Sequence, residues 1–220
     1  MAKRIGVLLS GCGVMDGSEI HEAVLTLLAI DNAGAEAICM APNVDQMDVV
    51  NHITGQPVKG QRRSILEEAA RIARGKIRDL ATVKATDLDA LAMPGGYGAA
   101  KNLCTYAVDG INCRVNPDAA RLVREMRAAK KPIAALCIAP VALTKILGKD
   151  VAVTVTIGTD AATANDIQRL GGQHVNCSAK DCVVDKTNKI VTTPAYMLAH
   201  SIAEAAVGIE KTIRALMDLL

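Results

Sequence analysis

The stretch that decides the fold is Ile133-Ala134-Ala135-Leu136-Cys137-Ile138-Ala139-Pro140. Its first four residues form a continuous apolar run, which predicts a short strand buried on both faces of a sheet. Pro140 stands near the first turn of a helix that we expect to continue to about Leu147, where its missing N–H costs nothing. A buried strand that runs through Cys137 into a helix is the thiol version of the nucleophile elbow, a tight turn that lifts a reactive side chain above the sheet edge.

Outward from this stretch, short apolar strands alternate with helical patterns in both directions. The alternation predicts βαβ units around a mainly parallel sheet, with a small hairpin near the end of the chain. No low-complexity linker or internal repeat interrupts it, so we expect one domain over residues 1–220. The expected strands are 5–9, 37–40, 88–93, 133–136, 151–157, 182–185 and 189–193. The expected helices are 18–33, 64–74, 117–129, one that follows the turn at 137 and runs to about 147, 160–170 and 197–220.

The composition narrows the classes of function. The 220 residues include no Phe, no Trp and three Tyr, which argues against the aromatic stacking used to bind single-stranded nucleic acid. The 25 basic and 23 acidic residues nearly cancel, and no basic block predicts a phosphate-backbone partner. No stretch reaches the roughly 18 apolar residues of a membrane span, and the first apolar run is too short for a signal peptide. We expect a cytoplasmic protein that binds neither nucleic acid nor membrane.

The seven cysteines predict a reducing compartment. Their odd number leaves at least one thiol unpaired, and no Cys-x-x-Cys motif occurs. The spacing of His174, Cys177 and Cys182 matches structural zinc sites poorly, because those sites need four ligands. We therefore expect no metal.

Cys137 is the strongest candidate for chemistry. The helix that follows it begins with unpaired N–H groups and a positive dipole end, and both favour thiolate over thiol. The pattern places the N–H groups of Ile138 and of the loop that ends at Gly96 on the same sheet edge, where they can receive a developing oxyanion. From the residues alone, a buried cysteine acting as a small apolar side chain is an equal alternative.

Glu19 and Glu22 are the next candidates. They lie three residues apart at the start of the first expected helix, on a face that looks toward the carboxyl edge of the sheet. A partly desolvated carboxyl group there can hold a proton and pass it to a substrate or to the thiol. The alternative is ordinary, since acidic residues complement the dipole of a helix in its first turn.

The remaining motifs are weaker. Gly11-Cys12-Gly13 with Gly17 resembles a dinucleotide loop, but the spacing to its last glycine is one residue too long, and the second strand ends without a ribose-binding carboxylate. We therefore expect no nucleotide cofactor. His174 and His200 both stay open as a base for the thiol, because nothing in the spacing selects either.

Six ordered motifs cover essentially the whole chain. They are Ser10-Gly11-Cys12-Gly13, Asp16-Gly17-Ser18-Glu19-Ile20-His21-Glu22, Pro94-Gly95-Gly96, Gly98-Ala99-Ala100-Lys101-Asn102-Leu103, Cys137-Ile138-Ala139-Pro140 and Thr192-Thr193-Pro194-Ala195-Tyr196-Met197. In this order they resemble the ElbB (enhancing lycopene biosynthesis) branch of the ThiJ/PfpI, class I glutamine amidotransferase-like superfamily. The resemblance implies a flavodoxin-like three-layer α/β sandwich that is usually a homodimer and needs no cofactor.

The same resemblance implies site roles and an activity. It makes Cys137 the reactive cysteine and Glu22 the glutamate that shares its proton, with Glu19 in the neighbouring acidic position. The implied activity is a cofactor-independent glyoxalase, which converts a small glyoxal-type dicarbonyl and water into a 2-hydroxy acid, and a link to isoprenoid biosynthesis. In this mechanism the thiolate adds to the aldehyde, Glu22 moves a proton through an enediol-like intermediate to a thioester, and N–H groups near Gly96 and Ile138 hold the oxyanions.

The chain departs from the superfamily at one place. Relatives carry a histidine shortly after the strand that follows the elbow helix, whereas this segment reads Thr156-Ile157-Gly158-Thr159-Asp160. We therefore expect a weak enzyme, and two alternatives stay open. In the first, Cys137 is an oxidisable thiol in a redox-sensing or regulatory dimer. In the second, the protein is a scaffold with a vestigial pocket.

Overall fold

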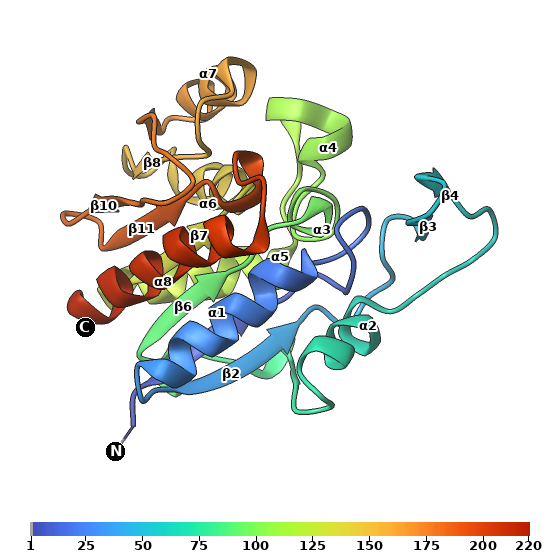
Figure 1. Ribbon diagram of the computed structural model, residues 1–220, viewed down its shortest axis with the longest axis horizontal. Coiled ribbons are helices and arrows are strands. Elements are labelled where there is room, and N and C mark those ends of the chain that lie inside the picture. Colours follow the sequence, from blue (N-terminus) through green and yellow to red (C-terminus); the bar gives the residue numbers. More distant parts are fainter. Residues whose placement is uncertain (1) are drawn as a thin grey trace.

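A seven-stranded sheet organises the computed structural model, which describes residues 2–220 (Figure 1). The strand order is β10-β11-β7-β6-β1-β2-β5; β10 pairs antiparallel with β11, and the other neighbours pair in parallel. The mainly parallel sheet predicted from the alternation is therefore confirmed. The strands are β1 Arg4–Leu8, β2 Glu36–Ala41, β5 Arg78–Asp79, β6 Ala90–Met93, β7 Ile133–Leu136, β10 Val183–Asp185 and β11 Ile190–Thr193.

Helices cover both faces of this sheet, so the flavodoxin-like three-layer fold is confirmed (Figure 1). α1, α2 and α8 pack on one face, and α5 and α6 pack on the other. The α-helices are α1 Ile20–Asn32, α2 Ile65–Ile72, α3 Tyr97–Lys101, α4 Tyr106–Asp109, α5 Pro117–Ala128, α6 Ala139–Leu147, α7 Ala161–Arg169 and α8 Ile202–Asp218; the 3-10 helices are η1 Leu80–Thr82, η2 Ala85–Asp87, η3 Gly110–Asn112 and η4 Ala195–Met197.

Side chains of the central strands pack into two separate cores, one on each face of the sheet. In β6, Ala90 and Ala92 join the core under α1 and α8, whereas Leu91 and Met93 join the core under α5 and α6. Successive side chains of a strand point to opposite faces, so a strand that is apolar at every position must be covered on both sides. This is why the short apolar runs of the sequence become interior strands.

Local signals set the ends of several helices. Pro117 is the first residue of α5, and Asn116 Oδ1 accepts a hydrogen bond from the Ala119 N–H at 3.1 Å. Gly34 follows α1 with a φ of +69°, a conformation that costs little without a side chain. These ends agree with the predicted helices to within a few residues.

The strand predicted at 151–157 is wrong in extent and position. β8 (Thr154–Val155) pairs with β9 (Gln173–His174) in a separate two-stranded parallel sheet. The Thr154 N–H donates to Asp185 Oδ2 at 2.9 Å, and the Thr156 N–H donates to Thr192 Oγ1 at 2.8 Å. Because side chains of β10 and β11 accept these bonds, the segment lies beside the main sheet without joining its ladder.

Two irregular segments also differ from expectation. α8 begins at Ile202 and not near Met197, because η4 redirects the chain after β11. β3 (Val50–Asn51) and β4 (Gln56–Pro57) form a hairpin on an arm that projects from the body of the molecule (Figure 1). This arm falls in a region whose sequence predicts only polar, irregular structure.

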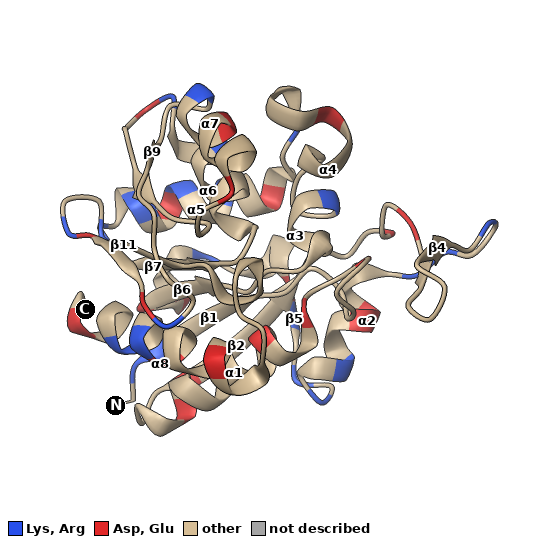
Figure 2. Cartoon of the chain, turned by 45° about the horizontal axis from the view of Figure 1, so that its top comes forward, with Lys and Arg blue, Asp and Glu red and all other residues tan. Residues whose placement is uncertain are grey.

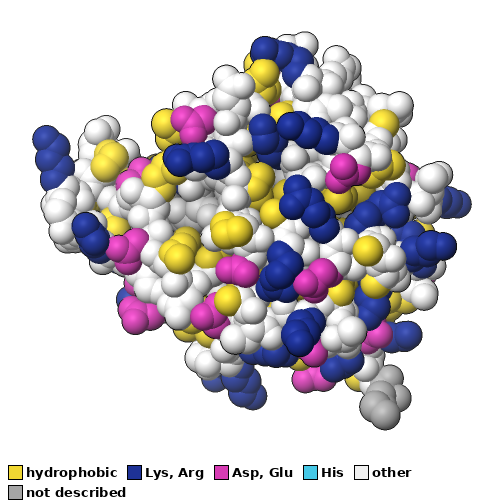
Figure 3. Space-filling view, turned by 180° about the vertical axis from the view of Figure 1, so that it is seen from behind, with side chains coloured by type: hydrophobic (Ala, Val, Ile, Leu, Met, Phe, Trp, Pro, Cys, Tyr) yellow, Lys and Arg dark blue, Asp and Glu magenta, His cyan; other side chains and the backbone are white. Residues whose placement is uncertain are grey.

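Positions of acidic and basic residues are interspersed over the helices and loops (Figure 2). The face opposite to that of Figure 1 shows the same mixture, with apolar side chains scattered between the charges (Figure 3). Within residues 2–220, no helix combines the length and the apolar character needed to cross a bilayer.

Candidate active site

Cys137 occupies a strained turn between β7 and α6. Its φ is +57°, a left-handed conformation that costs a non-glycine residue about 1 to 2 kcal/mol. The turn is held by the backbone, since the Cys137 N–H donates to the Thr193 carbonyl oxygen of β11 at 3.0 Å. A positive φ between a parallel strand and a helix is the geometry of a nucleophile elbow.

The elbow opens into a cavity of about 450 Å³ at the carboxyl edge of the sheet. Three loops and the start of α7 contribute to its wall. Cys137 itself is only 8% exposed, so a ligand reaches the thiol from inside this cavity. The wall includes Glu19, Gly96, Tyr97, Ile138, Asp160 and Tyr196.

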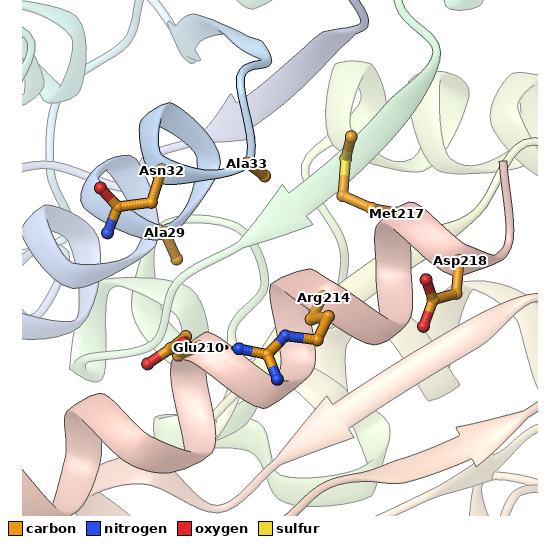
Figure 4. A pocket seen from close by; sticks show the side chains of 7 residues that line it. All are labelled: Ala29, Asn32, Ala33, Glu210, Arg214, Met217 and Asp218. Carbon is orange, nitrogen blue, oxygen red and sulfur yellow. Dashed lines mark hydrogen bonds and ion pairs between the residues drawn. The ribbon is translucent and has the colours of Figure 1, made fainter.

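A second hollow, drawn in Figure 4, lies elsewhere. It lies between the C-terminal ends of α1 and α8 and has a volume of about 200 Å³. Its main charged groups neutralise each other, since Arg214 pairs with Glu210 at 2.7 Å. Its seven lining residues include neither cysteine nor histidine.

Glu22 lies completely buried beside the thiol. Its Oε2 accepts the Gly95 N–H at 2.9 Å and its Oε1 accepts the Tyr196 N–H at 3.1 Å. Glu22 Oε2 and the Cys137 sulfur both lie against Gly95, 2.7 and 3.0 Å from where a Cβ on that residue would stand. Burial and the negative charge of Glu19 together raise the pKa of Glu22 to about 7, against the lowering effect of the two N–H donors. Glu22 can therefore both hold and release a proton near neutral pH.

Gly95 lets these two groups meet. A Cβ at this position would lie 2.4 Å from the Cys137 Cβ and 2.7 Å from Glu22 Oε2, both far inside van der Waals contact. The motif Pro94-Gly95-Gly96 thus brings bare backbone against the thiol and the carboxyl group. This close approach explains why glycine stands at residue 95.

The pKa of Cys137 moves opposite to expectation. The helix start predicts a lowered pKa, but burial raises it well above its ordinary value and the Glu22 carboxylate adds to the rise. Hydrogen bonds from the N–H groups of Gly96 and Ile138 lower the pKa without reversing the rise. Protonation of Glu22 removes the repulsion, so formation of the thiolate is tied to the proton on Glu22.

Glu19 caps α1. Its Oε2 accepts the Glu22 N–H at 2.7 Å, and its own N–H donates to the Gly95 carbonyl oxygen at 2.9 Å. It also lines the cavity, so it holds the first turn of α1 against the Gly95-Gly96 loop and adds negative charge to the wall. Gly96 faces this junction with a φ of +92°.

Neither of the two histidines left open by the sequence lines the cavity. His174 Nε2 accepts the Ile157 N–H at 3.3 Å, which places it under the β8 loop, and His200 lies on the surface of another hollow. The structure instead brings His21 to within 2.9 Å of the hydroxyl group of Tyr196, which lines the Cys137 cavity. Both residues stand in the quoted motifs, which is the signal that could have identified them.

Among residues 2–220, no group of three or more His, Cys, Asp and Glu side chains is arranged to hold a metal ion. The donors that face the thiol are backbone N–H groups and a carboxyl group.

Known proteins resemble the chain over its full length, although no protein-family model matches it. A human protein named glutamine amidotransferase-like class 1 domain-containing protein 3, mitochondrial, is 45% identical over 99% of this chain and 84% of that protein. A crystal structure from Ehrlichia chaffeensis, described as an isoprenoid biosynthesis protein with an amidotransferase-like domain, superposes with a TM-score of 0.93 at 40% identity over 99% of both chains. Drosophila melanogaster DJ-1beta shares the fold at 17% identity, with a TM-score of 0.58 over 100% of this chain and 96% of that one. The chain belongs to the glutamine amidotransferase-like class 1 family, in the ElbB branch of the ThiJ/PfpI superfamily.

Proposed function

We propose that this protein is a weak, cofactor-independent glyoxalase that converts a small glyoxal-type dicarbonyl and water into a 2-hydroxy acid. The observation that carries the proposal is the contact between the elbow thiol of Cys137 and the buried carboxyl group of Glu22. Backbone N–H groups of Gly96 and Ile138 lower the pKa of the same thiol, and the cavity of about 450 Å³ has room for a small substrate.

The reaction begins when Cys137 gives its proton to Glu22 and its sulfur adds to one aldehyde carbon. The oxygen that gains charge accepts hydrogen bonds from the N–H groups of Gly96 and Ile138 and then takes the proton that Glu22 holds, which gives a hemithioacetal and returns Glu22 to its carboxylate form. Glu22 next moves the proton from this carbon to its neighbour through an enediol, which leaves a thioester. One carbon is oxidised as the other is reduced, so no external redox partner is needed.

Hydrolysis of the thioester needs a group that accepts a proton from water. Tyr196 and His21 supply it in this proposal, because the Tyr196 hydroxyl group lies at the cavity wall and hydrogen-bonds to His21 Nδ1 at 2.9 Å. His21 is about half exposed, so a proton taken there exchanges with solvent. A base that acts through a tyrosine is consistent with a slow enzyme.

The test is turnover of glyoxal by the purified protein without glutathione or metal, followed by NMR of glycolate. Cys137→Ala is expected to abolish turnover, and Glu22→Gln to reduce it by roughly 10²-fold or more. Cys177→Ser is the matched control, because Cys177 lies on a different hollow and should leave the rate unchanged. Equal rates for the wild type and Cys137→Ala would contradict the proposal.

A second function is favoured by one observation, the absence of His174 and His200 from the cavity. In this alternative, Cys137 is a regulatory thiol that limiting peroxide converts to sulfenic or sulfinic acid. The N–H groups of Gly96 and Ile138 would then stabilise the oxidised form. Mass spectrometry distinguishes it, because oxidation spread evenly over all seven cysteines counts against a dedicated sensor.

A homodimer is part of the proposal. Ile20, Val24 and Leu28 form an exposed apolar stripe along α1 at four-residue spacing, with exposures of 43%, 48% and 50%. A second copy of the chain, packed against this stripe, is the proposed partner. Val24→Lys should then shift the mass measured by light scattering toward a monomer, while Val108→Lys on α4 should not; identical masses would contradict it.

The pathway and compartment are proposals of the same kind. The Ehrlichia structure carries isoprenoid biosynthesis in its description, and we propose the same link for this chain. The human relative is named as mitochondrial, so the cytoplasmic location predicted from the sequence needs cell fractionation with a matrix marker as its test.

A further inference from the structure

Cys104 and Cys113 form a thiol pair outside the Cys137 cavity. Both are buried, with exposures of 2% and 3%, and they pack together against Ala142 of α6. The Cys104 thiol donates a hydrogen bond to the Ala99 carbonyl oxygen at 3.4 Å, which fixes its side chain within this cluster. Neither residue has a role in the proposed function.

The backbone already holds the two cysteines in place. Cys104 forms an antiparallel bridge with Val115, and the Thr105 N–H donates to the Arg114 carbonyl oxygen at 2.9 Å. The segment between Cys104 and Cys113 is therefore a loop whose two ends lie side by side. A bond between the sulfurs adds little loop-closure entropy cost, because the folded chain has closed this loop already.

The two thiols are not equivalent. The interaction between the two thiols raises the pKa of Cys104 and lowers the pKa of Cys113; burial adds to the rise at Cys104, and the positive charge of Lys145 lowers the pKa of both. Lys145 is fixed near Cys113 because its Nζ donates to the Ile111 carbonyl oxygen at 2.7 Å. Cys113 is thus the nucleophile of the pair, and Cys104 is the thiol placed to resolve it.

We propose that Cys104 and Cys113 are a redox modification site that forms a reversible intramolecular disulfide. In the first step the Cys113 sulfur attacks hydrogen peroxide. An S–O bond forms as the O–O bond breaks, so Cys113 becomes a sulfenic acid and the peroxide is reduced to hydroxide. The Cys104 sulfur then attacks Cys113; an S–S bond forms, the S–O bond breaks, and the hydroxyl group leaves with the Cys104 proton as water. A small dithiol reverses the reaction.

Exposure alone gives a different expectation. Cys177 and Cys182, like Cys12, are more accessible than Cys104 and Cys113, but burial of the sulfur and the negative charge of Asp181 raise the pKa of Cys177 and Cys182. A peroxide reaction governed by exposure would modify these accessible thiols first. A reaction governed by thiolate character and by a resolving partner modifies Cys113 first.

The experiment treats the full-length protein with limiting hydrogen peroxide, blocks free thiols with iodoacetamide, and maps tryptic peptides without reduction. Trypsin releases residues 102–114 as one peptide whose only cysteines are Cys104 and Cys113. We expect this peptide to lose two hydrogens and to resist alkylation in most molecules, and to regain both thiols after dithiothreitol. The proposal is overturned if both cysteines stay alkylatable after Cys177 or Cys182 has been oxidised.

Single variants resolve the two steps. In Cys104→Ser, Cys113 should accumulate as a sulfenic acid that a 1,3-dione probe captures, and in Cys113→Ser the probe should leave Cys104 unlabelled. Equal labelling of the two variants would contradict the assigned order. The wild-type peptide map needs no variant, so the proposal stays testable if either substitution impairs folding.

Discussion

Cys137 and Cys113 flank the same helix, α6, and both are buried, yet their surroundings act on them in opposite directions. Cys137 lies before the first turn of α6 beside the Glu22 carboxyl group, and its pKa is raised. Cys113 packs against the side of α6, where Cys104 and Lys145 lower its pKa. Burial acts on both thiols in the same sense, so the neighbouring groups decide the difference.

The comparison separates two kinds of cysteine chemistry. At Cys137 the thiolate appears only when a proton moves to the adjacent acid, which suits addition to a substrate that returns the proton. At Cys113 a neighbouring thiol and a cation stabilise the thiolate directly, which suits oxidation by a small oxidant.

The largest expected effect is a pH-dependent stability that comes from Glu22. Burial raises its pKa from about 4.5 to about 7, so the folded protein binds this proton more tightly than the unfolded protein. The stabilisation is complete below about pH 4.5 and is lost as the pH rises through about 7, a loss of about 3 kcal/mol. Urea unfolding of the wild type and Glu22→Gln between pH 4.5 and 8 measures it as a difference in slope.

Glu36→Gln is the control for this measurement, because Glu36 is exposed on β2 and the variant should keep the wild-type slope. Glu22→Gln should also lose stability at every pH, since its amide has one oxygen for two N–H donors and leaves one of them unpaired. Identical pH profiles for Glu22→Gln and the wild type would show that Glu22 titrates normally in the folded protein.

The next effect is steric and concerns Gly95. The Cβ of Gly95→Ala would overlap the Cys137 Cβ at 2.4 Å, and this backbone-linked atom has little room to move. We expect a loss of about 2 kcal/mol in the free energy of unfolding, with turnover of glyoxal abolished. Gly34→Ala is the control, because its Cβ meets open space and only its φ of +69° is penalised, at about 1 kcal/mol. Equal losses would refute the overlap.

A smaller effect tests the coupling between Glu22 and Cys137. Glu22→Gln removes the negative charge that raises the pKa of the thiol, so Cys137 should be alkylated about tenfold faster at pH 8. The tryptic peptide that spans 131–145 carries Cys137 as its sole cysteine, which lets mass spectrometry follow this residue alone. Alkylation of Cys113 in the same samples should not change, and a parallel rise there would indicate general loosening of the fold.

The sequence predicts those parts of the site that depend on neighbouring residues. The turn at Cys137 is predicted by the apolar run 133–136 before it and by Pro140 after it, and Glu22 is identified by the motif at the start of the first helix. The lowered pKa predicted for Cys137 is wrong, because that prediction rests on the start of α6 alone. The larger contributions, burial and the Glu22 charge, arise only when α1 packs beside the elbow.

Contacts between irregular segments have no signal in the sequence pattern. His21 reaches Tyr196 because η4 turns the chain back over α1, and Cys104 meets Cys113 through a bridge between two loops. Neither contact has a periodic pattern that could predict it. The strand expected at 151–157 fails for a related reason, since side chains of distant strands take its hydrogen bonds.

The smallest expected effect belongs to Lys145. Lys145→Met removes one positive charge near Cys113 but keeps an unbranched apolar side chain at this position of α6. The pKa of Cys113 should therefore rise, and its reaction with peroxide should slow by roughly twofold to fivefold at pH 7. The rate of loss of free thiol in peptide 102–114 measures this, with the exposed Lys149→Met as the control. High ionic strength gives a second test, because it weakens a charge effect at a partly exposed lysine. The peroxide reaction rates of the wild type and Lys145→Met should therefore converge in high salt. A difference that persists in high salt would assign the effect to packing, and Cys113 would then owe its thiolate to Cys104 alone.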